Sequence, residues 1–519
     1  DAERAIATIG VDGTTHDVTA RQFENPSGDG VTWVYTEELS QDGDWTVDVS
    51  LTDPVGYASN EVHDAFTIDT LAPMITVEFD NNDARSGMYF NRPRTATITV
   101  RERNFDPSLM GVSTSAKDAS GNAADAPGAS GWSATGEEDT WSCTVHFGGE
   151  LHYGLSVSAA DPAGNQTEAY EVPEFVIDMT PPQASVEHVE NKAAYAGEVA
   201  PSLSMSDTNL SIGNSTYSLT GAHSGKVDYM RGMETSYSDT SESVTYADFE
   251  HKVERDDVYT LTVHAEDLAG NTSDVTRVFS VNRYGSNYLY SDDTANILGA
   301  YLKAPQDVVI TEINVSGLED QTHVELAHDN EVTNLVEGDT YTAETADDSG
   351  WSKTTYTIPA SNFSRDGYYR VMVTSHDKAG NLSQNTMGNK DATREHAAEV
   401  NFAVDTTAPT VGFAGASTGG VYFGSSHDAL PLANDNLALA RVTVQVDNDE
   451  PQEYSPDDFA GGPASFQIPA DAKLHTLTIA AYDKAGNVHS TTLGAVAVAP
   501  NWVEYLKANP SFEFFAGIV

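Results

Sequence analysis

Cysteine is almost missing from this chain, since Cys143 is the only one among 519 residues. A single cysteine cannot form a disulfide within the chain, which excludes the small disulfide-stapled domains that animals secrete. Cys143 stands in the stretch TWSCTVHF, where no His/Asn framework accompanies it. We therefore interpret it as a strand residue and not as a catalytic nucleophile.

Basic residues are scarce as well. The chain has 26 Lys and Arg against 79 Asp and Glu, which gives a net charge of −53 at pH 7. Binding to the phosphate backbone requires Lys and Arg, so this surface excludes nucleic acid as a partner. It repels anionic lipid headgroups for the same reason. An acidic surface favours solubility, and it can attract divalent cations.

Long apolar runs and catalytic signatures are the third absence. No stretch approaches the roughly 18 apolar residues of a membrane-spanning helix. The sequence has no His-Glu-x-x-His or Walker motif. We expect no enzymatic activity from this region. Helical periodicity is confined to DTANILGAYLKA at 293–304.

A five-residue motif, Asp-x-Ala-Gly-Asn, recurs along the chain. It reads DPAGN at 161–165, DLAGN at 267–271, and DKAGN at both 377–381 and 483–487, with a degenerate copy in DPVGYASN from residue 53. Its aspartates are spaced by 108, 106, 110 and 106 residues and are Asp53, Asp161, Asp267, Asp377 and Asp483. A period near 100 residues is typical of tandem immunoglobulin-type sandwiches.

A ring-bearing residue stands eight positions before each of these aspartates. Between the two, every second residue is apolar or small, as in YTLTVHAED, which predicts a strand with one face in a core. Three of the rings fit the tyrosine corner of immunoglobulin-type folds, whereas Trp45 and His475 predict packing alone. The five rings are Trp45, Tyr153, Tyr259, Tyr369 and His475.

A second apolar segment follows each motif, so strand, motif and strand together predict a hairpin. The glycine supplies the positive φ of a tight turn, the aspartate can accept bonds from the amides after it, and the asparagine tolerates left-handed backbone. We favour this structural role over a metal loop. The glycines are Gly164, Gly270, Gly380 and Gly486, and the asparagines are Asn165, Asn271, Asn381 and Asn487.

Prolines mark the boundaries between repeats. Asp is followed four residues later by Pro at Asp69/Pro73, Asp178/Pro182 and Asp405/Pro409, and proline ends a strand because it cannot donate to a sheet. The boundary at VNRYGSN lacks both residues, so we expect a hinge or an altered angle there. The predicted domains are 1–70 (truncated at its N-terminus), 71–179, 180–283, 284–406 and 407–500, with a tail at 501–519 leading towards a membrane anchor.

Calcium is the main functional alternative to turn chemistry. Carboxylates and asparagines cluster in FDNNDARSG, MSDTNLS, ANDNLALA and VDNDEPQE, and calcium takes six to eight oxygen ligands from such residues. None of these clusters has EF-hand spacing, and a calcium site is most plausible where a loop of one module meets the next. The weak candidates are Asp80, Asp83, Asp207, Asp435, Asp447 and Asp449; otherwise we expect no cofactor.

Several longer stretches resemble the bacterial Ig-like repeats of large Gram-positive cell-surface proteins. They are DTTAPTV, the strands ending in DKAGN, PRTATITVRERNFDPS, and FSVNRYGSNYLY with QDVVITEINVSGLED. The last residues, NWVEYLKANPSFEFFAGIV, resemble the region before a C-terminal membrane anchor in such proteins. A β chain without disulfides also points to a bacterial surface or to the cytosol.

The resemblance implies an all-β fold of tandem immunoglobulin-like β-sandwich domains in an elongated array. It further implies an extracellular, surface-attached stalk or adhesin that projects an N-terminal head or presents binding faces. Host or bacterial surface glycans or proteins would be its partners, and a membrane would be reached only through a C-terminal anchor. The alternative is a glycan-binding or spacer region of an extracellular carbohydrate-active or proteolytic enzyme. Fold does not decide between these functions.

Overall fold

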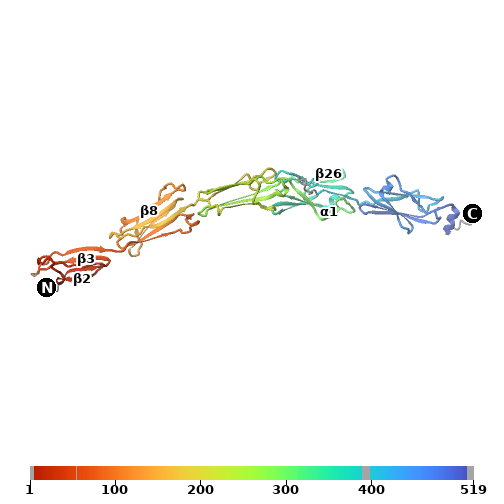
Figure 1. Ribbon diagram of the computed structural model, residues 1–519. Coiled ribbons are helices and arrows are strands. Elements are labelled where there is room, and N and C mark those ends of the chain that lie inside the picture. Colours follow the sequence, from red (N-terminus) through yellow and green to blue (C-terminus); the bar gives the residue numbers. More distant parts are fainter. Residues whose placement is uncertain (1–4, 54, 388–397, 511–519) are drawn as a thin grey trace.

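The computed structural model describes residues 5–53, 55–387 and 398–510, and it shows an elongated row of β-sandwich domains (Figure 1). The alternating apolar residues of each repeat build strands whose inward faces form a core of their own. Five separate hydrophobic clusters result, one in each repeat. The all-β class and the tandem Ig-like arrangement predicted from the sequence are thus confirmed. No helix among the described residues is both long and apolar enough to cross a membrane.

The first domain has one four-stranded antiparallel sheet in the order β2-β1-β3-β4. Its small core is built around Trp45 and Val18. Its strands are β1 (Ala5–Val11), β2 (Thr14–Thr19), β3 (Gly43–Val49) and β4 (Val62–Ile68).

The second domain packs two sheets, β5-β7-β10-β9 and β6-β12-β11-β8. This is the strand order of an immunoglobulin sandwich, with the short β6 joined in parallel to the last strand, β12. Its strands are β5 (Met74–Phe79), β6 (Tyr89–Phe90), β7 (Arg94–Arg101), β8 (Met110–Lys117), β9 (Ser133–Ala134), β10 (Thr140–Phe147), β11 (His152–Ala159) and β12 (Tyr170–Ile177).

The third domain repeats this plan with sheets β13-β15-β19-β18 and β14-β21-β20-β16-β17. The short β14 again pairs in parallel with the last strand. Its strands are β13 (Gln183–Glu187), β14 (Ala194–Tyr195), β15 (Ser202–Ser206), β16 (Thr216–Gly221), β17 (Gly225–Lys226), β18 (Glu234–Ser238), β19 (Ser241–Thr245), β20 (Asp257–Glu266) and β21 (Thr272–Val281).

The fourth domain has sheets β22-β24-β28-β27 and β23-β31-β29-β25-β26, with β30 paired to β29. Helix α1 (Asp292–Ile297) occupies the first part of the segment with helical periodicity. Its strands are β22 (Asn287–Tyr290), β23 (Tyr301–Leu302), β24 (Val308–Asn314), β25 (His323–His328), β26 (Glu331–Asn334), β27 (Thr342–Asp348), β28 (Trp351–Ile358), β29 (Gly367–His376), β30 (Leu382–Gln384) and β31 (Val400–Val404).

The fifth domain has sheets β32-β34-β37 and β33-β39-β38-β35-β36. Helix α2 (Trp502–Ala508) follows its last strand and buries Tyr505 against Ala497 and Ala499; the rest of the predicted tail, 511–519, lies outside the described residues. The strands are β32 (Thr410–Ala414), β33 (Val421–Phe423), β34 (Asp428–Asn434), β35 (Leu439–Val446), β36 (Gln452–Tyr454), β37 (Phe466–Gln467), β38 (His475–Asp483) and β39 (Val488–Ala499).

Four linkers of equal length join these domains. Each has five residues between the last strand of one domain and the first strand of the next: 69–73, 178–182, 282–286 and 405–409. We call these the first, second, third and fourth joints. Linkers this short, three of them ending in proline, leave little slack between neighbouring domains.

Candidate metal centres at the domain joints

The repeated motif forms the turn of a hairpin, between the two longest strands of the sheet in the third and fifth domains and between β29 and the short β30 in the fourth. In the third domain β20 and β21 pair over their full length, and the turn between them begins at Asp267. The carboxylate of Asp267 accepts bonds from the backbone N–H of Asn271 at 2.9 Å and from its side-chain Nδ2 at 2.7 Å. Gly270 has φ of 85°, which explains the glycine at that position. The same turn is present at Asp161, Asp377 and Asp483.

The asparagine of the motif also grips the preceding domain. Its Nδ2 donates to the backbone carbonyl of the first linker residue, which lies 82 to 99 positions earlier in the chain. We call this bond the asparagine clamp. The four clamps are Asn165 to Asp69 (2.9 Å), Asn271 to Asp178 (2.8 Å), Asn381 to Asn282 (2.8 Å) and Asn487 to Asp405 (2.7 Å). The motif is therefore a turn that also fixes a joint.

Two further turns have the same local hydrogen bonds as the motif but form no asparagine clamp. In the first domain Asp53 accepts a bond from the N–H of Tyr57, which replaces the asparagine and is exposed. DASGN at 118–122 forms the same turn, with Asn122 bonded to Asp118, although the motif search on sequence did not include it. Asn122 is exposed and donates to no linker carbonyl among the described hydrogen bonds. The local sequence thus determines the turn, whereas the position of the turn in the domain determines whether its side chain bonds the preceding linker.

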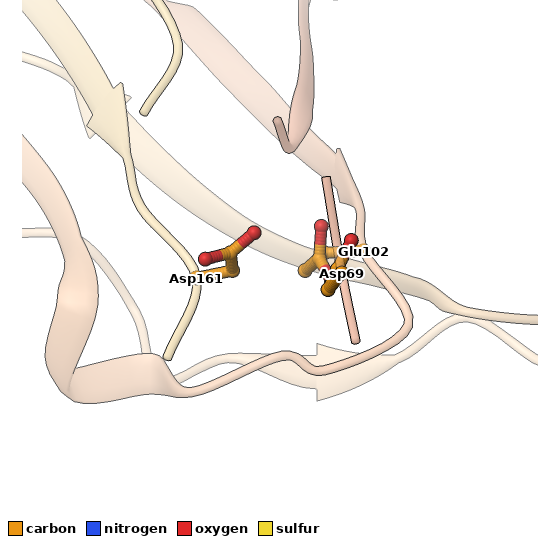
Figure 2. A group of neighbouring side chains, drawn as sticks. All are labelled: Asp69, Glu102 and Asp161. Carbon is orange, nitrogen blue, oxygen red and sulfur yellow. The ribbon is translucent and has the colours of Figure 1, made fainter. Parts of the chain in front are cut away.

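Three of the four joints bring three carboxylates together. Each group combines the first linker residue, the acid directly after the third strand of the next domain (β7, β15 or β34), and the aspartate of the motif. One oxygen from each member lies within 4.8 Å of the others. The groups are Asp69, Glu102 and Asp161 at the first joint (Figure 2), Asp178, Asp207 and Asp267 at the second, and Asp405, Asp435 and Asp483 at the fourth.

The third joint replaces two of these acids by asparagines. Asn282 Nδ2 donates to Asp377 Oδ2 at 2.9 Å, and Asn314 Nδ2 donates to the same oxygen at 3.1 Å. Asn282 also donates to Ser316 Oγ at 3.0 Å. The buried carboxylate of the motif, Asp377, is therefore satisfied at this joint by neutral amide donors of the protein.

The linker aspartates of the other joints differ in their partners. At the first joint Asn104 Nδ2 donates to Asp69 Oδ2 at 2.8 Å, and at the second Asn209 Nδ2 donates to Asp178 Oδ2 at 2.5 Å. Both asparagines stand two residues after the loop acid. At the fourth joint that position is Leu437, which has no side-chain donor.

Crowding of these carboxylates raises pKa values. Burial raises the pKa of Glu102, Asp207 and Asp267, and neighbouring carboxylates of the same groups add to the effect. The largest rise is at Asp405, where burial and the charges of Asp435 and Asp483 bring the pKa to about 6. A raised carboxyl pKa means that the ionised group costs folding free energy at neutral pH unless a proton or a cation compensates it.

The six calcium candidates chosen from the sequence fall into two sets. Asp207 and Asp435 belong to the carboxylate groups at the second and fourth joints. The other four belong to none of the groups found among the described residues: Asp80 accepts a bond from Thr95 N–H, Asp83 pairs with Arg92, Asp447 pairs with His475, and Asp449 is exposed. The sequence search followed local acid density and so missed the groups' other members, whose signal was the recurrence of a linker and a turn aspartate.

The corner rings share one contact, a hydrogen bond to the residue four positions earlier. Tyr153, Tyr259 and Tyr369 donate from Oη to the carbonyls of Gly149, Arg255 and Arg365. Packing alone was expected for Trp45 and His475, but the structure differs. Trp45 Nε1 donates to Gln41 O at 2.9 Å, and His475 Nε2 bonds Asp471 Oδ1 at 2.7 Å. An indole or imidazole N–H can reach the same place as the tyrosine hydroxyl.

The third joint, where the sequence predicted a hinge or an altered angle, has cross-domain contacts beyond its clamp. Trp351 Nε1 of the fourth domain donates to Asp257 Oδ1 of the third at 2.8 Å. The ring of His223 lies 4.2 Å from that of Trp351, and its Nε2 bonds Asp348 O at 3.1 Å. These contacts oppose free bending and do not favour a hinge, and the altered angle at this joint stays a prediction.

One sequence pattern that suggests catalysis is explained by its geometry. Residues 415–419 read GASTG, which matches Gly-x-Ser-x-Gly, but they connect β32 to β33 and no helix follows. A nucleophile elbow requires a strand-to-helix turn. His427 Nε2 bonds Gly415 O at 2.6 Å and does not contact the hydroxyl of Ser417 through any described hydrogen bond.

Models of bacterial Ig-like domains match two regions of the chain. A model described as bacterial Ig-like domain (group 3) matches residues 149–284, and a model described as bacterial Ig-like domain matches residues 431–498. These two regions are therefore similar to bacterial Ig-like domains. The first matched region includes the second joint and the motifs that begin at Asp161 and Asp267. The second matched region includes Asp483. No curated protein matches the chain.

Several solved structures of proteins with tandem domains are similar to this chain over part of its length. A tetra-tandem repeat from the extending region of a large adhesion protein is 16% identical, covers 82% of this chain and 99% of its own, and has a TM-score of 0.34. FdeC, an Escherichia coli adhesin, is 15% identical, covers 64% and 96%, and has a TM-score of 0.21. The protocadherin GammaB4 extracellular domain is 12% identical, covers 96% and 77%, and has a TM-score of 0.24.

Proposed function

We propose that this chain is a non-catalytic stalk or adhesion region of a surface-attached bacterial protein, working outside the cell. One observation carries the proposal: separately cored sandwiches stand end to end, and an asparagine clamp fixes each of the four joints. The matches to bacterial Ig-like models and the net charge of −53 support it. A strongly acidic rod stays soluble and repels its neighbours.

The joints explain how such a chain keeps its length. Each linker has five residues, so neighbouring domains cannot move far apart or fold back without breaking contacts. At the first joint Arg103 of the second domain adds ion pairs to Asp12 at 2.6 Å and Asp44 at 3.0 Å of the first. Exposed pairs of this kind contribute little to stability, so the half-buried clamp of Asn165 is the stronger restraint.

Small-angle scattering on the full chain tests the proposal. An extended stalk gives a pair-distance distribution with a long tail and a cross-section of one sandwich, and the extension persists in physiological salt. A compact particle would contradict the stalk function. The matched variants are Asn165→Ala and Asn122→Ala: loss of a clamp shortens the mean extension, whereas loss of the exposed turn asparagine leaves it unchanged.

Glycan binding is a second candidate, favoured by one cavity. The fourth domain has an open cavity of about 620 Å³ lined by Tyr341, Trp351, Lys378 and Glu337, among other residues. Sugars bind in such sites through aromatic faces and a few polar groups. Two other tryptophans that could stack on a sugar, Trp132 and Trp141, pack against Phe105 instead. A glycan array with the wild-type chain and Lys378→Ala checks this function, and binding that the variant does not weaken would place the glycan elsewhere.

A further inference from the structure

The fourth joint buries a charged oxygen that has no donor. Asp405 is fully buried, and its Oδ2 has no hydrogen-bond partner among the residues that the structure describes. Its other oxygen accepts a bond from Thr407 N–H at 3.3 Å. Asp435 Oδ1 is likewise buried and without a partner. An unsatisfied buried polar group costs about 1–3 kcal/mol, and more when it is charged, so two of them in one group require compensation.

No cationic side chain supplies that compensation in the described part of the chain. None of the ion pairs found there includes Asp405, Asp435 or Asp483. Lys484 follows the motif aspartate, but its Nζ lies over the ring of Tyr301, 5.1 Å from the centroid. No described side chain therefore compensates the excess negative charge of this joint.

The other joints show two ways in which this protein avoids an unpaired carboxylate at the first linker position. The first and second place the amide of Asn104 or Asn209 against the linker aspartate. The third replaces the linker aspartate itself by Asn282. The fourth has neither device, because Leu437 stands where the amide would be. The described residues therefore leave these carboxylates without compensation, which a bound cation would supply.

We propose that Asp405, Asp435 and Asp483 bind one Ca²⁺ ion that bridges the fourth and fifth domains. Three carboxylates with an oxygen each inside 4.8 Å form a hard, all-oxygen site with a net charge of −3. Calcium accepts irregular sets of six to eight oxygens, whereas Mg²⁺ demands near-ideal octahedral geometry and gives up water reluctantly. Ligands from a linker and two loops suit the more tolerant ion.

The proposal is confined to this joint. The first two carboxylate groups have a donor on the linker aspartate, and at the third joint asparagines replace two of the three acids of the group. The ion at the fourth joint would add bonds from the end of one domain to two loops of the next. Bending between the fourth and fifth domains would then depend on calcium, while bending at the third joint would not.

Calorimetric titration of the full, chelator-treated chain with CaCl₂ tests the site. We expect the wild type to bind one more Ca²⁺ than Asp405→Asn, whatever the first two groups bind. Asn282 already occupies the equivalent position of the third joint, so this variant is compatible with the fold, and circular dichroism checks it. Equal stoichiometry in both chains would overturn the proposal.

Three comparisons sharpen the titration. Leu437→Asn supplies the missing amide and is expected to weaken calcium binding at this site at least tenfold. Asp449→Asn removes an exposed charge from the same domain and should leave the stoichiometry unchanged; loss of a site in this control would contradict the assignment. MgCl₂ should bind at least tenfold more weakly, and equal affinity for Mg²⁺ would overturn the choice of calcium.

Spin-label distances measure the mechanical consequence. Labels at Val332→Cys and Val488→Cys span the fourth joint, and labels at Tyr237→Cys and Val332→Cys span the third, all at exposed positions. The native Cys143 is buried, with its pKa raised by burial to about 11, and it labels poorly. Chelation should broaden the first distribution and leave the second unchanged. Any other pattern would contradict a calcium bridge at the fourth joint.

Discussion

The third and fourth joints use one backbone design with opposite side-chain chemistry. In both, the motif asparagine donates to the carbonyl of the first linker residue, at 2.8 Å and 2.7 Å. At the third joint the residues around that clamp are two asparagines and one aspartate, and at the fourth they are three aspartates. The clamp geometry therefore does not dictate the charge of a joint, and charge can be varied while the backbone connection is kept.

The difference extends into the cores beside the two joints. The fourth domain buries Glu312, which accepts bonds from Tyr288 Oη at 3.0 Å and Tyr356 Oη at 2.7 Å, and also from the hydroxyl of Ser375. In the fifth domain the residues two before Asp435 and Asp483 are Ala433 and Ala481, both apolar. The core next to the third joint thus contains a hydrogen-bonded network around Glu312, whereas the equivalent positions next to the fourth joint are apolar.

The largest effect is expected when the third joint receives the charge of the fourth. Asn282→Asp replaces an amide donor by a second carboxylate beside the buried Asp377. We expect a loss of about 3–5 kcal/mol in the stability of the fourth domain, because the repulsion is buried and lacks a counter-charge. Urea unfolding followed by the fluorescence of Trp351, which lies at this joint, measures it. An unchanged midpoint would show that the two joints are interchangeable.

Removing a clamp should have the next largest effect. Asn487→Ala deletes the buried bonds to Asp405 O and to the carboxylate of Asp483, with an expected cost of about 2–3 kcal/mol. Asn122→Ala deletes only an exposed side-chain bond within its own turn, with an expected cost of about 0.5–1 kcal/mol. Thermal unfolding of the two full-length variants compares them. Equal costs would mean that the clamp adds nothing to the turn.

The cross-domain contact of Trp351 should contribute less. Trp351→Phe keeps a ring beside His223 but removes the N–H that donates to Asp257 Oδ1. We expect a loss of about 1 kcal/mol, visible as a lower unfolding temperature of the third and fourth domains, while the fifth domain is unaffected. A shift confined to the fifth domain would contradict the placement of this contact.

A pH effect should distinguish the corner of the fifth domain from that of the fourth. Burial alone would lower the pKa of His475, but its bonds to Asp447 and Asp471 outweigh burial and raise the pKa above the ordinary 6.5. The resulting stability is fully present below pH 6.5 and is lost as the pH rises through the folded pKa. The unfolding midpoint should fall as the pH rises above 6.5, and His475→Tyr should reduce that fall. An equal fall in both chains would assign the effect to other groups.

The local structure of each repeat was predictable from its letters. Alternating apolar residues before Asp267 predict β20, the Gly270 position predicts the turn, and the prolines at 73, 182 and 409 predict where domains end. These signals are local because strand alternation, positive φ and the missing proline N–H act within a few residues. The fold class followed from the regular spacing of the five turns.

The carboxylate groups at the joints could not be predicted from local sequence patterns. Asp69 and Asp161 are more than 90 residues apart and meet only because a linker and a hairpin turn lie at the same end of a domain. Acid-rich stretches such as FDNNDARSG drew attention instead, yet Asp80 and Asp83 bond neighbours within their own loop. Conversely, the missing Asp and Pro at VNRYGSN suggested looseness, whereas Asn282 completes a hydrogen-bonded network.

The asparagine clamp also gives the chain a direction of assembly. The gripping residue belongs to the hairpin near the C-terminal end of each domain, while the gripped carbonyl belongs to the domain before it. A chain synthesised from its N-terminus must complete each of these hairpins before it can fasten the preceding domain. Rigidity would then spread from the first joint towards the fourth, one domain behind the growing polypeptide.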